Sequence, residues 1–262
     1  MSNILPFYNT DLLVSKKVLI DLLNILPQPR IPKTGRKPIP LKYLLNGILQ
    51  VLVNGVAWRK IAFCGCSYMS CYRYFRELQR IGKLKLIYRK LSLDKTDITE
   101  YAIDSDTINS FRFKSCVVWD GKHRKNGTKN SILTDQKGLP ADIEFGKGNK
   151  HDLTFVNKHI KNTSRRRKKL LNLDKGYTSK ELRRELKKKG IKINMETRQN
   201  DYKRKRGPKF GFNKEKYKTR FLIERQFAWI ENFKRLRIRV ERLIASFKAF
   251  VYMALIIILI RN

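Results

Sequence analysis

Three acidic side chains stand where regular elements begin or end in an otherwise basic chain. Asp104 lies in the alternating segment "YAIDSDTI" (101–108), Asp174 ends the apolar run "KLLNLD" (169–174), and Glu224 lies in a helix-like segment. Active sites of α/β sheets collect at the ends of their strands. If the two strands are neighbours, their ends bring Asp104 and Asp174 together, and we expect the later helix to lay Glu224 across them.

Three carboxylates in one groove repel one another unless divalent cations neutralise them. Hard oxygen ligands select Mg²⁺ or Mn²⁺, and two such ions about 3.5–4 Å apart can activate an attacking oxygen and stabilise a leaving oxygen at phosphorus. The pattern therefore indicates a site for two Mg²⁺ (or Mn²⁺) ions. The alternative is structural, with Asp174 capping the following helix or pairing with a lysine. Asp106 shares a strand face with Asp104 and is a competing candidate acid.

The charge of the chain indicates its class of partner. Lys and Arg number 59 against 22 Asp and Glu, which gives a formal net charge of +37 that is spread along most of the sequence. Such a field favours a polyanion, and nucleic acid is the commonest one. A ribosomal or packaging protein, or a lysine-rich proteome, is the alternative. The basic segments 161–169 and 201–216 are predicted to be solvated loops that contact phosphate.

The N-terminal part of the chain has a helical pattern. Apolar residues recur at helical spacing in the segment 38–53, which predicts an amphipathic helix; they are Leu41, Leu44, Leu45, Ile48 and Leu52. "AWRKIA" (57–62) begins a second short helix, and Ser70 is a plausible N-cap for a third over 71–84. Three short helices joined by tight turns are typical of a helix-turn-helix unit.

The third predicted helix has two different sides. Tyr74, Phe75 and Leu78 can pack inward, whereas the opposite side is polar and basic. A recognition helix lying against DNA explains this pattern, and an ordinary basic helix face is the alternative. The predicted DNA contacts on this side are Arg73, Arg76 and Arg80.

The period changes after the polar segment "SLDKTDITE" (92–100), so we place a domain boundary there. The expected division is a helical DNA-binding domain over 1–95 and an α/β catalytic domain over 96–262. Strands are predicted over 101–108, 129–136, 139–147, 169–174 and 191–195, with a helix over 179–190. This order indicates a mixed sheet flanked by helices. The segment from 217 onward looks helical almost to residue 262.

In chain order these motifs resemble the DDE transposases of bacterial insertion sequences. The resemblance is to the subgroup with a Y-x2-R-x3-E signature, which is present as Tyr217, Arg220 and Glu224. "AIDSDT" places the first family aspartate at Asp104, and "LDKGY" places the second at Asp174. The segment 35–61 is also similar to the helical domain that precedes the core in these enzymes.

The resemblance implies a ribonuclease-H-like core, preceded by a small helix-turn-helix-type domain, in which Asp104, Asp174 and Glu224 hold the metal ions. It implies a Mg²⁺-dependent transposase that binds the double-stranded ends of its insertion sequence, cuts them with water and joins the freed 3′-hydroxyl to target DNA. Tyr217 and Arg220 would contact the DNA near the scissile bond. Because two element ends must be held together, a homodimer on DNA is expected.

One position departs from the family pattern. Where a related signature extends to a lysine after the glutamate, this chain has Glu231. At 100° per residue Arg235 returns to the Glu224 face of a continuous helix, so Arg235 and the adjacent Lys234 are predicted DNA contacts. The competing functions are an inactive DNA-binding protein derived from a transposase, and a related nuclease that does not join strands.

The remaining features concern location and thiol chemistry. No secretory signal opens the sequence, and the apolar run 250–260 is well short of the roughly 20 residues that a membrane span requires. A cytoplasmic, nucleoid-associated protein without a membrane partner is therefore expected. The four cysteines have no nearby histidine and no C-x-x-C spacing, which favours reduced structural thiols over zinc; they are Cys64, Cys66, Cys71 and Cys116.

Overall fold

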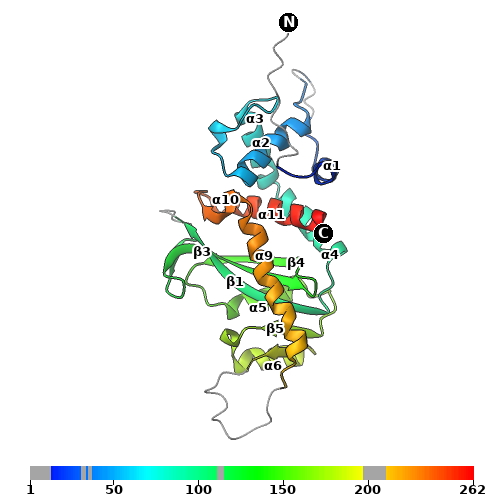
Figure 1. The fold of residues 1–262 in the computed structure, drawn as a ribbon, viewed down its shortest axis with the longest axis vertical. Helices are drawn as coiled ribbons and strands as arrows, with labels where there is room; N and C mark the ends of the chain where they lie inside the picture. The colour runs from blue at the N-terminus through cyan, green and yellow to red at the C-terminus, as the bar shows by residue number, and fades with distance from the viewer. Residues whose placement is uncertain (1–12, 31–33, 35–36, 111–114, 197–210) are drawn as a thin grey trace. The chain divides into compact units, whose positions relative to one another are not determined.

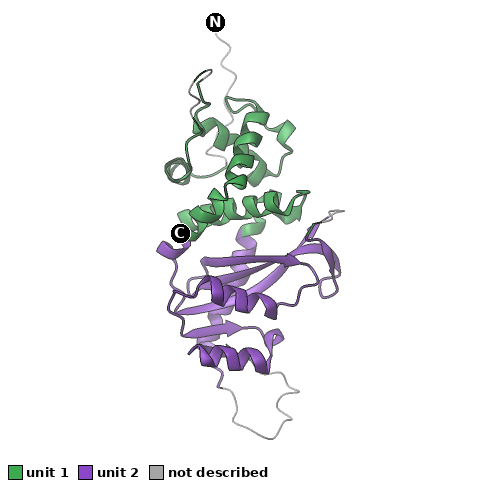
Figure 2. Ribbon diagram, turned by 180° about the vertical axis from the view of Figure 1, so that it is seen from behind, with its two compact units in different colours: residues 1–91, 111–115, 230–262 green, residues 92–110, 116–229 purple. Residues whose placement is uncertain are grey.

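The computed structural model describes residues 13–30, 34, 37–110, 115–196 and 211–262. These residues form two compact units (Figure 2). Unit 1 contains the described residues up to 91 together with 115 and 230–262, and unit 2 contains 92–110 and the described residues of 116–229. The predicted basic loop over 201–216 lies largely outside the described residues.

Unit 2 is built on a mixed β-sheet with the strand order β2-β3-β1-β5-β6, and β4 pairs with β3. β3 runs antiparallel to β1, β2 and β4, whereas β1, β5 and β6 are parallel to one another. The five predicted strands are confirmed, and β2 was not predicted. The strands are β1 (Glu100–Ser110), β2 (Val118–Asp120), β3 (Lys125–Asp135), β4 (Pro140–Lys147), β5 (Leu170–Leu173) and β6 (Lys192–Met195).

The two faces of this sheet are covered differently. Helices α5 (Leu153–Asn162) and α6 (Lys180–Lys188) cover one face, and α9 (Leu222–Glu231) crosses the other (Figures 1 and 2). The face under α5 and α6 is apolar, because alternate residues of β1 and β5 point into one buried cluster. The members contributed by these two strands are Tyr101, Ile103, Leu171 and Leu173. The even-numbered residues of both strands consequently belong to the α9 side.

Unit 1 is helical. All five apolar residues predicted to form one face of α2 are buried, and Tyr74, Phe75 and Leu78 of α3 are buried as expected. The N-cap of α3 is Ser67 rather than Ser70. The helical elements of unit 1 are α1 (Lys16–Ile25), α2 (Leu41–Asn54), the 3₁₀ turn η2 (Trp58–Lys60), α3 (Tyr68–Arg80), most of α4 (Lys83–Lys95), α10 (Lys234–Arg237) and α11 (Ile244–Arg261).

The C-terminal helix completes the core of unit 1. Phe250 of α11 stacks on Phe75 with 4.2 Å between ring centroids, and Tyr252 packs against Tyr88 at 5.6 Å. α11 is long and apolar enough to cross a membrane by length and composition, but 67% of this helix is buried inside the structure. The last part of the chain therefore belongs to the same compact unit as the first.

The prediction of nearly continuous helix from 217 onward is wrong. The segment divides into α8 (Lys214–Tyr217), η4 (Lys218–Phe221), α9, α10, the short strand β7 (Ile238–Arg239) and α11. Burial of two side chains fixes the breaks: Phe233 is buried at a non-helical N-cap, and Arg239 is fully buried and donates to the carbonyl of Ser115 at 2.9 Å. These tertiary contacts override a locally helical pattern.

Truncation of Leu171 tests the core that carries β5. Leu171 is fully buried, so Leu171→Ala should lower the free energy of unfolding by about 2–5 kcal/mol through lost burial and a residual cavity. Leu93 of α4 is 61% exposed, and Leu93→Ala should change that free energy by no more than about 0.5 kcal/mol. Urea denaturation followed by circular dichroism measures both. Equal effects of the two substitutions would contradict this core assignment.

Candidate active site

Strand register brings the two predicted aspartates together. β1 and β5 are parallel, with Glu100 opposite Leu170 and Ala102 opposite Asn172. If this register continues for two more residues, it leads to Asp104 and to Asp174, which directly follows β5. The two carboxylates are close enough for the charge of Asp174 to raise the pKa of Asp104. Both side chains are half-buried. Because Tyr101 and Ile103 point into the apolar cluster, alternation along β1 places Asp104 on the opposite face of the sheet. The predicted adjacency of the two strands is thus confirmed.

Contacts with the β3–β4 turn hold the beginning of α9. The guanidinium of Arg225 donates to the carbonyl of Lys137 at 2.6 Å. Gly138 has a φ of +81°, and a Cβ there would lie 2.8 Å from the Cβ of Leu222, so only glycine allows this close approach. Glu224 lies in the first turn of α9 and is exposed.

Arg220 links two of the three acids. Its Nη2 donates to Oδ2 of Asp104 at 3.1 Å, and its Nη1 donates to Oε1 of Glu224 at 3.3 Å. The side chains of Arg220 and Asp104 are only 16% and 19% exposed, whereas that of Glu224 is 63% exposed. The bond to Asp104 is therefore the better shielded of the two and contributes more.

The electrostatics of the site reflect this crowding. Burial raises the pKa of Asp104, and the nearby Asp174 raises it further, although a hydrogen bond from the Ser105 N–H and the charge of Arg220 act in the opposite direction. For Arg220, burial lowers the pKa, but Asp104 and the neighbouring acidic groups outweigh it, so the net shift is upward. Arg220 therefore stays charged beside Asp104, whose own pKa is raised.

Two hydrogen bonds between side chains connect η4 to the sheet, and the sequence analysis did not predict them. The Asn194 amide donates to the side-chain carbonyl of Asn172 at 2.8 Å, and the Asn172 amide donates to the Thr219 hydroxyl at 2.7 Å. Thr219 directly precedes Arg220, so these hydrogen bonds help to position that arginine. The available signal was an asparagine inside each of the apolar runs "LLNL" and "KINM", where a buried polar group requires a partner.

The residues present fit hard divalent cations through their donor chemistry. The three acids offer only carboxylate oxygens, and the raised pKa of Asp104 shows the electrostatic cost that a cation would relieve. In the part of the chain that the structure describes, the oxygens of Asp104, Asp174 and Glu224 do not form a group that lies entirely within 4.8 Å.

Comparison with known proteins identifies the family. Residues 95–259 match the family described as "Transposase DDE domain". The chain belongs to this family. Residues 21–88 of this transposase also match the family described as "Putative transposase of IS4/5 family".

Two proteins of an insertion element from Burkholderia cepacia are similar to this transposase. The "Insertion element IS402 uncharacterized 16.2 kDa protein" is 37% identical over 100 residues, which cover 35% of this chain and 68% of that protein. The "Putative transposase for insertion sequence element IS402" is 30% identical over 125 residues, which cover 44% of this chain and 54% of that protein.

A solved structure shares the fold. The piggyBac transposase in a synaptic complex with hairpin DNA matches with a TM-score of 0.51 and 13% sequence identity, over 95% of this chain and 73% of that one. At this identity the likeness concerns the fold alone. Together with the mixed sheet flanked by helices, it confirms the expected ribonuclease-H-like class.

The tyrosine of the signature is packed beside the acids of the transposase. Tyr217 is 9% exposed, and its ring contacts those of Phe212 and Phe221 at centroid distances of 5.0 and 6.0 Å. Burial raises its pKa, the charge of Arg220 lowers it, and Asp174 raises it. Tyr217 and Arg220 therefore share one electrostatic environment with the aspartates, and a contact of either with DNA stays a prediction.

Arg235 does not continue the helix that carries Glu224, so the helical-wheel argument for it is wrong. α9 ends at Glu231, and Arg235 lies in α10 within unit 1. Its guanidinium donates to the nearly buried carboxylate of Glu241 at 2.6 Å, with the Arg235 side chain 13% exposed. The neighbouring Lys234 is exposed. Glu241 is therefore the ion-pair partner of Arg235.

The basic side of α3 is present as predicted. Arg73 and Arg80 are exposed, whereas Arg76 is half-buried and donates to the Ser246 hydroxyl at 3.2 Å.

The competing acid Asp106 lies on the same face of β1 as Asp104, with 4.0 Å between its carboxylate and the ammonium of Lys125. This spacing gives Asp106 a separate electrostatic partner.

Removal of the Arg220 charge tests the electrostatic description of the transposase site. In metal-free protein, Arg220→Met should raise the pKa of Asp104 further, because the positive charge that opposes its burial is lost. A titration of the carboxyl carbons by ¹³C NMR measures this. Arg225→Met is the control, since Arg225 bonds to Lys137 instead of the acids. An unchanged or lowered pKa in Arg220→Met would refute the description.

Proposed function

We propose that this transposase binds the ends of its insertion sequence and catalyses metal-dependent DNA strand cleavage and strand transfer. The observation that supports the proposal is the parallel pairing of β1 with β5. Continued by two residues, its register leads to Asp104 and Asp174, and Arg220 bonds to both Asp104 and Glu224. These acids are proposed as ligands for two Mg²⁺ or Mn²⁺ ions. When bound, the ions would activate the attacking oxygen and stabilise the leaving oxygen at phosphorus.

The protein groups around the acids suit positioning and charge stabilisation. Arg220 already spans Asp104 and Glu224, so cations on those carboxylates would release its guanidinium toward a phosphate of the DNA. A guanidinium binds phosphate through paired N–H donors and stays charged throughout. The buried ring of Tyr217 and the Asn172–Thr219 bond keep this part of η4 in place, which favours an attack geometry fixed before reaction.

DNA binding is proposed to use the basic side of α3, with Arg73, Arg76 and Arg80 as contacts, and the exposed Lys234. The net charge of +37 provides the general attraction for phosphates. Because two element ends must be processed together, the transposase is expected to act as a homodimer on double-stranded DNA, at the nucleoid. Membership of the Y-x2-R-x3-E subgroup rests on Tyr217, Arg220 and Glu224 and belongs to the same proposal.

Two other functions are consistent with the family. An inactive DNA-binding derivative would bind element ends without cutting them, and a nuclease would cut without joining. The acids at all three signature positions favour an enzyme over the inactive derivative. Product analysis with labelled donor DNA separates a transposase from a nuclease, because a nuclease yields no strand-transfer product.

Substitution of Asp174 tests the proposed chemistry. With Mg²⁺ or Mn²⁺ and DNA carrying the flanking element ends, Asp174→Asn should reduce cleavage and joining by at least about 100-fold, since loss of an outer-shell partner alone costs a metal site 10–100-fold. DNA binding should persist, because the substitution removes a negative charge. The readouts are gel analysis of labelled products and a mobility-shift assay.

Asp106→Asn is the matched control for this experiment. Asp106 lies on the same sheet face but faces Lys125, so cleavage should remain within a few-fold of wild type. Loss of cleavage in Asp106→Asn and retention in Asp174→Asn would refute the assignment. Wild-type binding without cleavage would place the chain among the inactive derivatives.

The basic side of α3 can be tested by the salt dependence of binding. Arg73→Ala with Arg80→Ala should weaken DNA binding, and each lost phosphate contact should reduce the slope of log affinity against log salt by about 1. Arg76→Ala should have a smaller effect, because part of that side chain is occupied by Ser246. Fluorescence anisotropy at several salt concentrations measures the slopes. An unchanged slope in the double variant would exclude this surface.

A further inference from the structure

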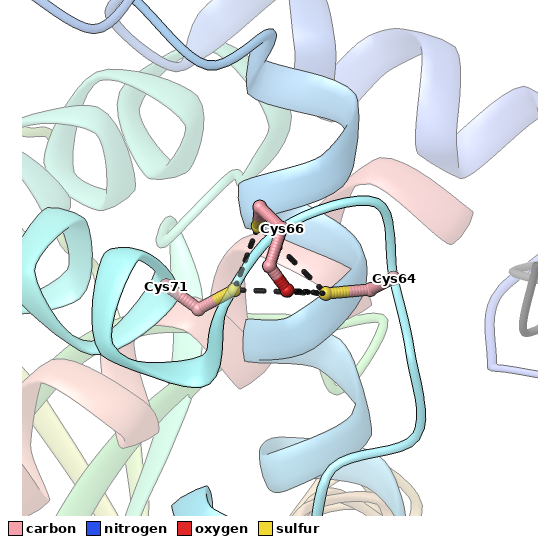
Figure 3. A group of neighbouring side chains, drawn as sticks. All are labelled: Cys64, Cys66 and Cys71. Atoms are coloured by element: carbon pink, nitrogen blue, oxygen red, sulfur yellow. Dashed lines mark hydrogen bonds between the residues drawn. The ribbon is translucent and has the colours of Figure 1, made fainter.

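Three cysteines of unit 1 form a compact sulfur cluster (Figure 3). The Sγ atoms of Cys64 and Cys66 are 3.8 Å apart, those of Cys64 and Cys71 are 3.7 Å apart, and those of Cys66 and Cys71 are 3.4 Å apart. Cys64 and Cys71 are buried, and Cys66 is half-buried. No pair is bonded, since a disulfide requires about 2.05 Å.

The fold holds the segment that carries the first two cysteines. The buried side chain of Gln50 in α2 accepts from the Ala62 N–H at 2.7 Å and donates to the Ala62 carbonyl at 3.1 Å. Gly65 has a φ of +88°, and a Cβ there would lie 2.5 Å from the ring of Tyr43. Contacts at Ala62 and at Gly65 thus hold the backbone on both sides of Cys64, in a conformation that brings the thiols of Cys64 and Cys66 together.

Helix α3 supplies the third sulfur. Cys71 lies near the beginning of α3, whose N-cap is Ser67. A Cβ on Gly47 of α2 would lie 2.5 Å from the Cys71 Sγ, so the absence of a side chain there makes room for this sulfur. The cluster is therefore formed by contacts between helices and by the segment before α3, and all of them lie within unit 1.

The spacing of the sulfurs matches a metal polyhedron. In a tetrahedral zinc site with Zn–S bonds of about 2.3 Å, adjacent sulfurs are about 3.8 Å apart. All three distances in the cluster are close to this value, so a cation can enter the triangle with little movement of the backbone. We propose that Cys64, Cys66 and Cys71 bind a Zn²⁺ ion as thiolates, a site independent of the proposed carboxylate centre.

The ligand chemistry sets the selectivity and the fourth position. Thiolates are soft ligands that favour Zn²⁺ over Mg²⁺. Within the described residues, the group contains no fourth cysteine, histidine or carboxylate, so water or a thiol from solution takes the remaining corner. The ion would connect the segment 64–66 to α3 and would stabilise the helix that presents Arg73 and Arg80.

Zinc content of the full chain tests the site. Protein purified under reducing conditions, loaded with Zn²⁺ and dialysed should retain roughly one ion per chain, measured by elemental mass spectrometry. Cys66→Ser should lose that ion, whereas Cys116→Ser should keep it, because Cys116 lies outside the cluster. Circular dichroism checks that both variants fold. These readouts do not depend on DNA cleavage, so they test the zinc site independently of the proposed function.

Cobalt provides a second measurement on the unmodified chain. Co²⁺ should produce thiolate-to-metal charge-transfer absorption that Zn²⁺ abolishes and excess Mg²⁺ does not. Zinc should also slow the reaction of three of the four thiols with a thiol reagent. Absence of retained zinc together with absence of the charge-transfer band would overturn the proposal. A disulfide among these cysteines in protein kept under reducing conditions would overturn it as well.

Discussion

The candidate active site depends on the parallel pairing of β1 with β5. Tyr101 and Ile103 of β1 are buried in the core on one face, so Asp104 must belong to the other face. A slip of one residue would turn Asp104 into the apolar core, where an unpaired carboxylate is costly. The hydrophobic alternation that stabilises the sheet therefore also fixes the place of the acid relative to Asp174.

That constraint creates a repulsion that the surrounding elements must offset. The charge of Asp174, which directly follows β5, raises the pKa of Asp104 in the adjacent strand β1, and Arg220 donates a hydrogen bond to Asp104 at 3.1 Å. The arginine is delivered by η4, which the Asn172–Thr219 bond connects to β5 itself. β5, which leads to Asp174, thus also holds the segment that carries Arg220. Because Glu224 is exposed, solvent weakens its bond to Arg220. In the proposed function, a cation on Glu224 and a phosphate on Arg220 would replace this bond.

The sequence predicted elements that have a regular period and missed those set by distant contacts. β1 and β5 were recognisable from alternation and from an acid at the end of an apolar run, and α2 from its apolar face. The break near Phe233 was not, because "FKRLRIRVERL" keeps helical spacing while Arg239 is buried against Ser115. The Asn172–Asn194 pair was likewise hidden, since the partner of a buried amide lies in another strand. Local patterns carry periodicity but not the identity of distant partners.

The same limit explains why the thiols and the acids differed in how far they could be predicted. Asp104 and Asp174 each follow from a strand pattern, so their meeting required only a topology. The spacing Cys64-x-Cys66-x4-Cys71 matches no common zinc pattern, and its convergence depends on Gly47 and Gly65. The two ligand sets also differ in hardness: carboxylates suit Mg²⁺, and thiolates suit Zn²⁺. Each proposed ligand set lies wholly within one compact unit, so ligand chemistry would allow a single chain to bind two kinds of ion without either site having to exclude the other by shape.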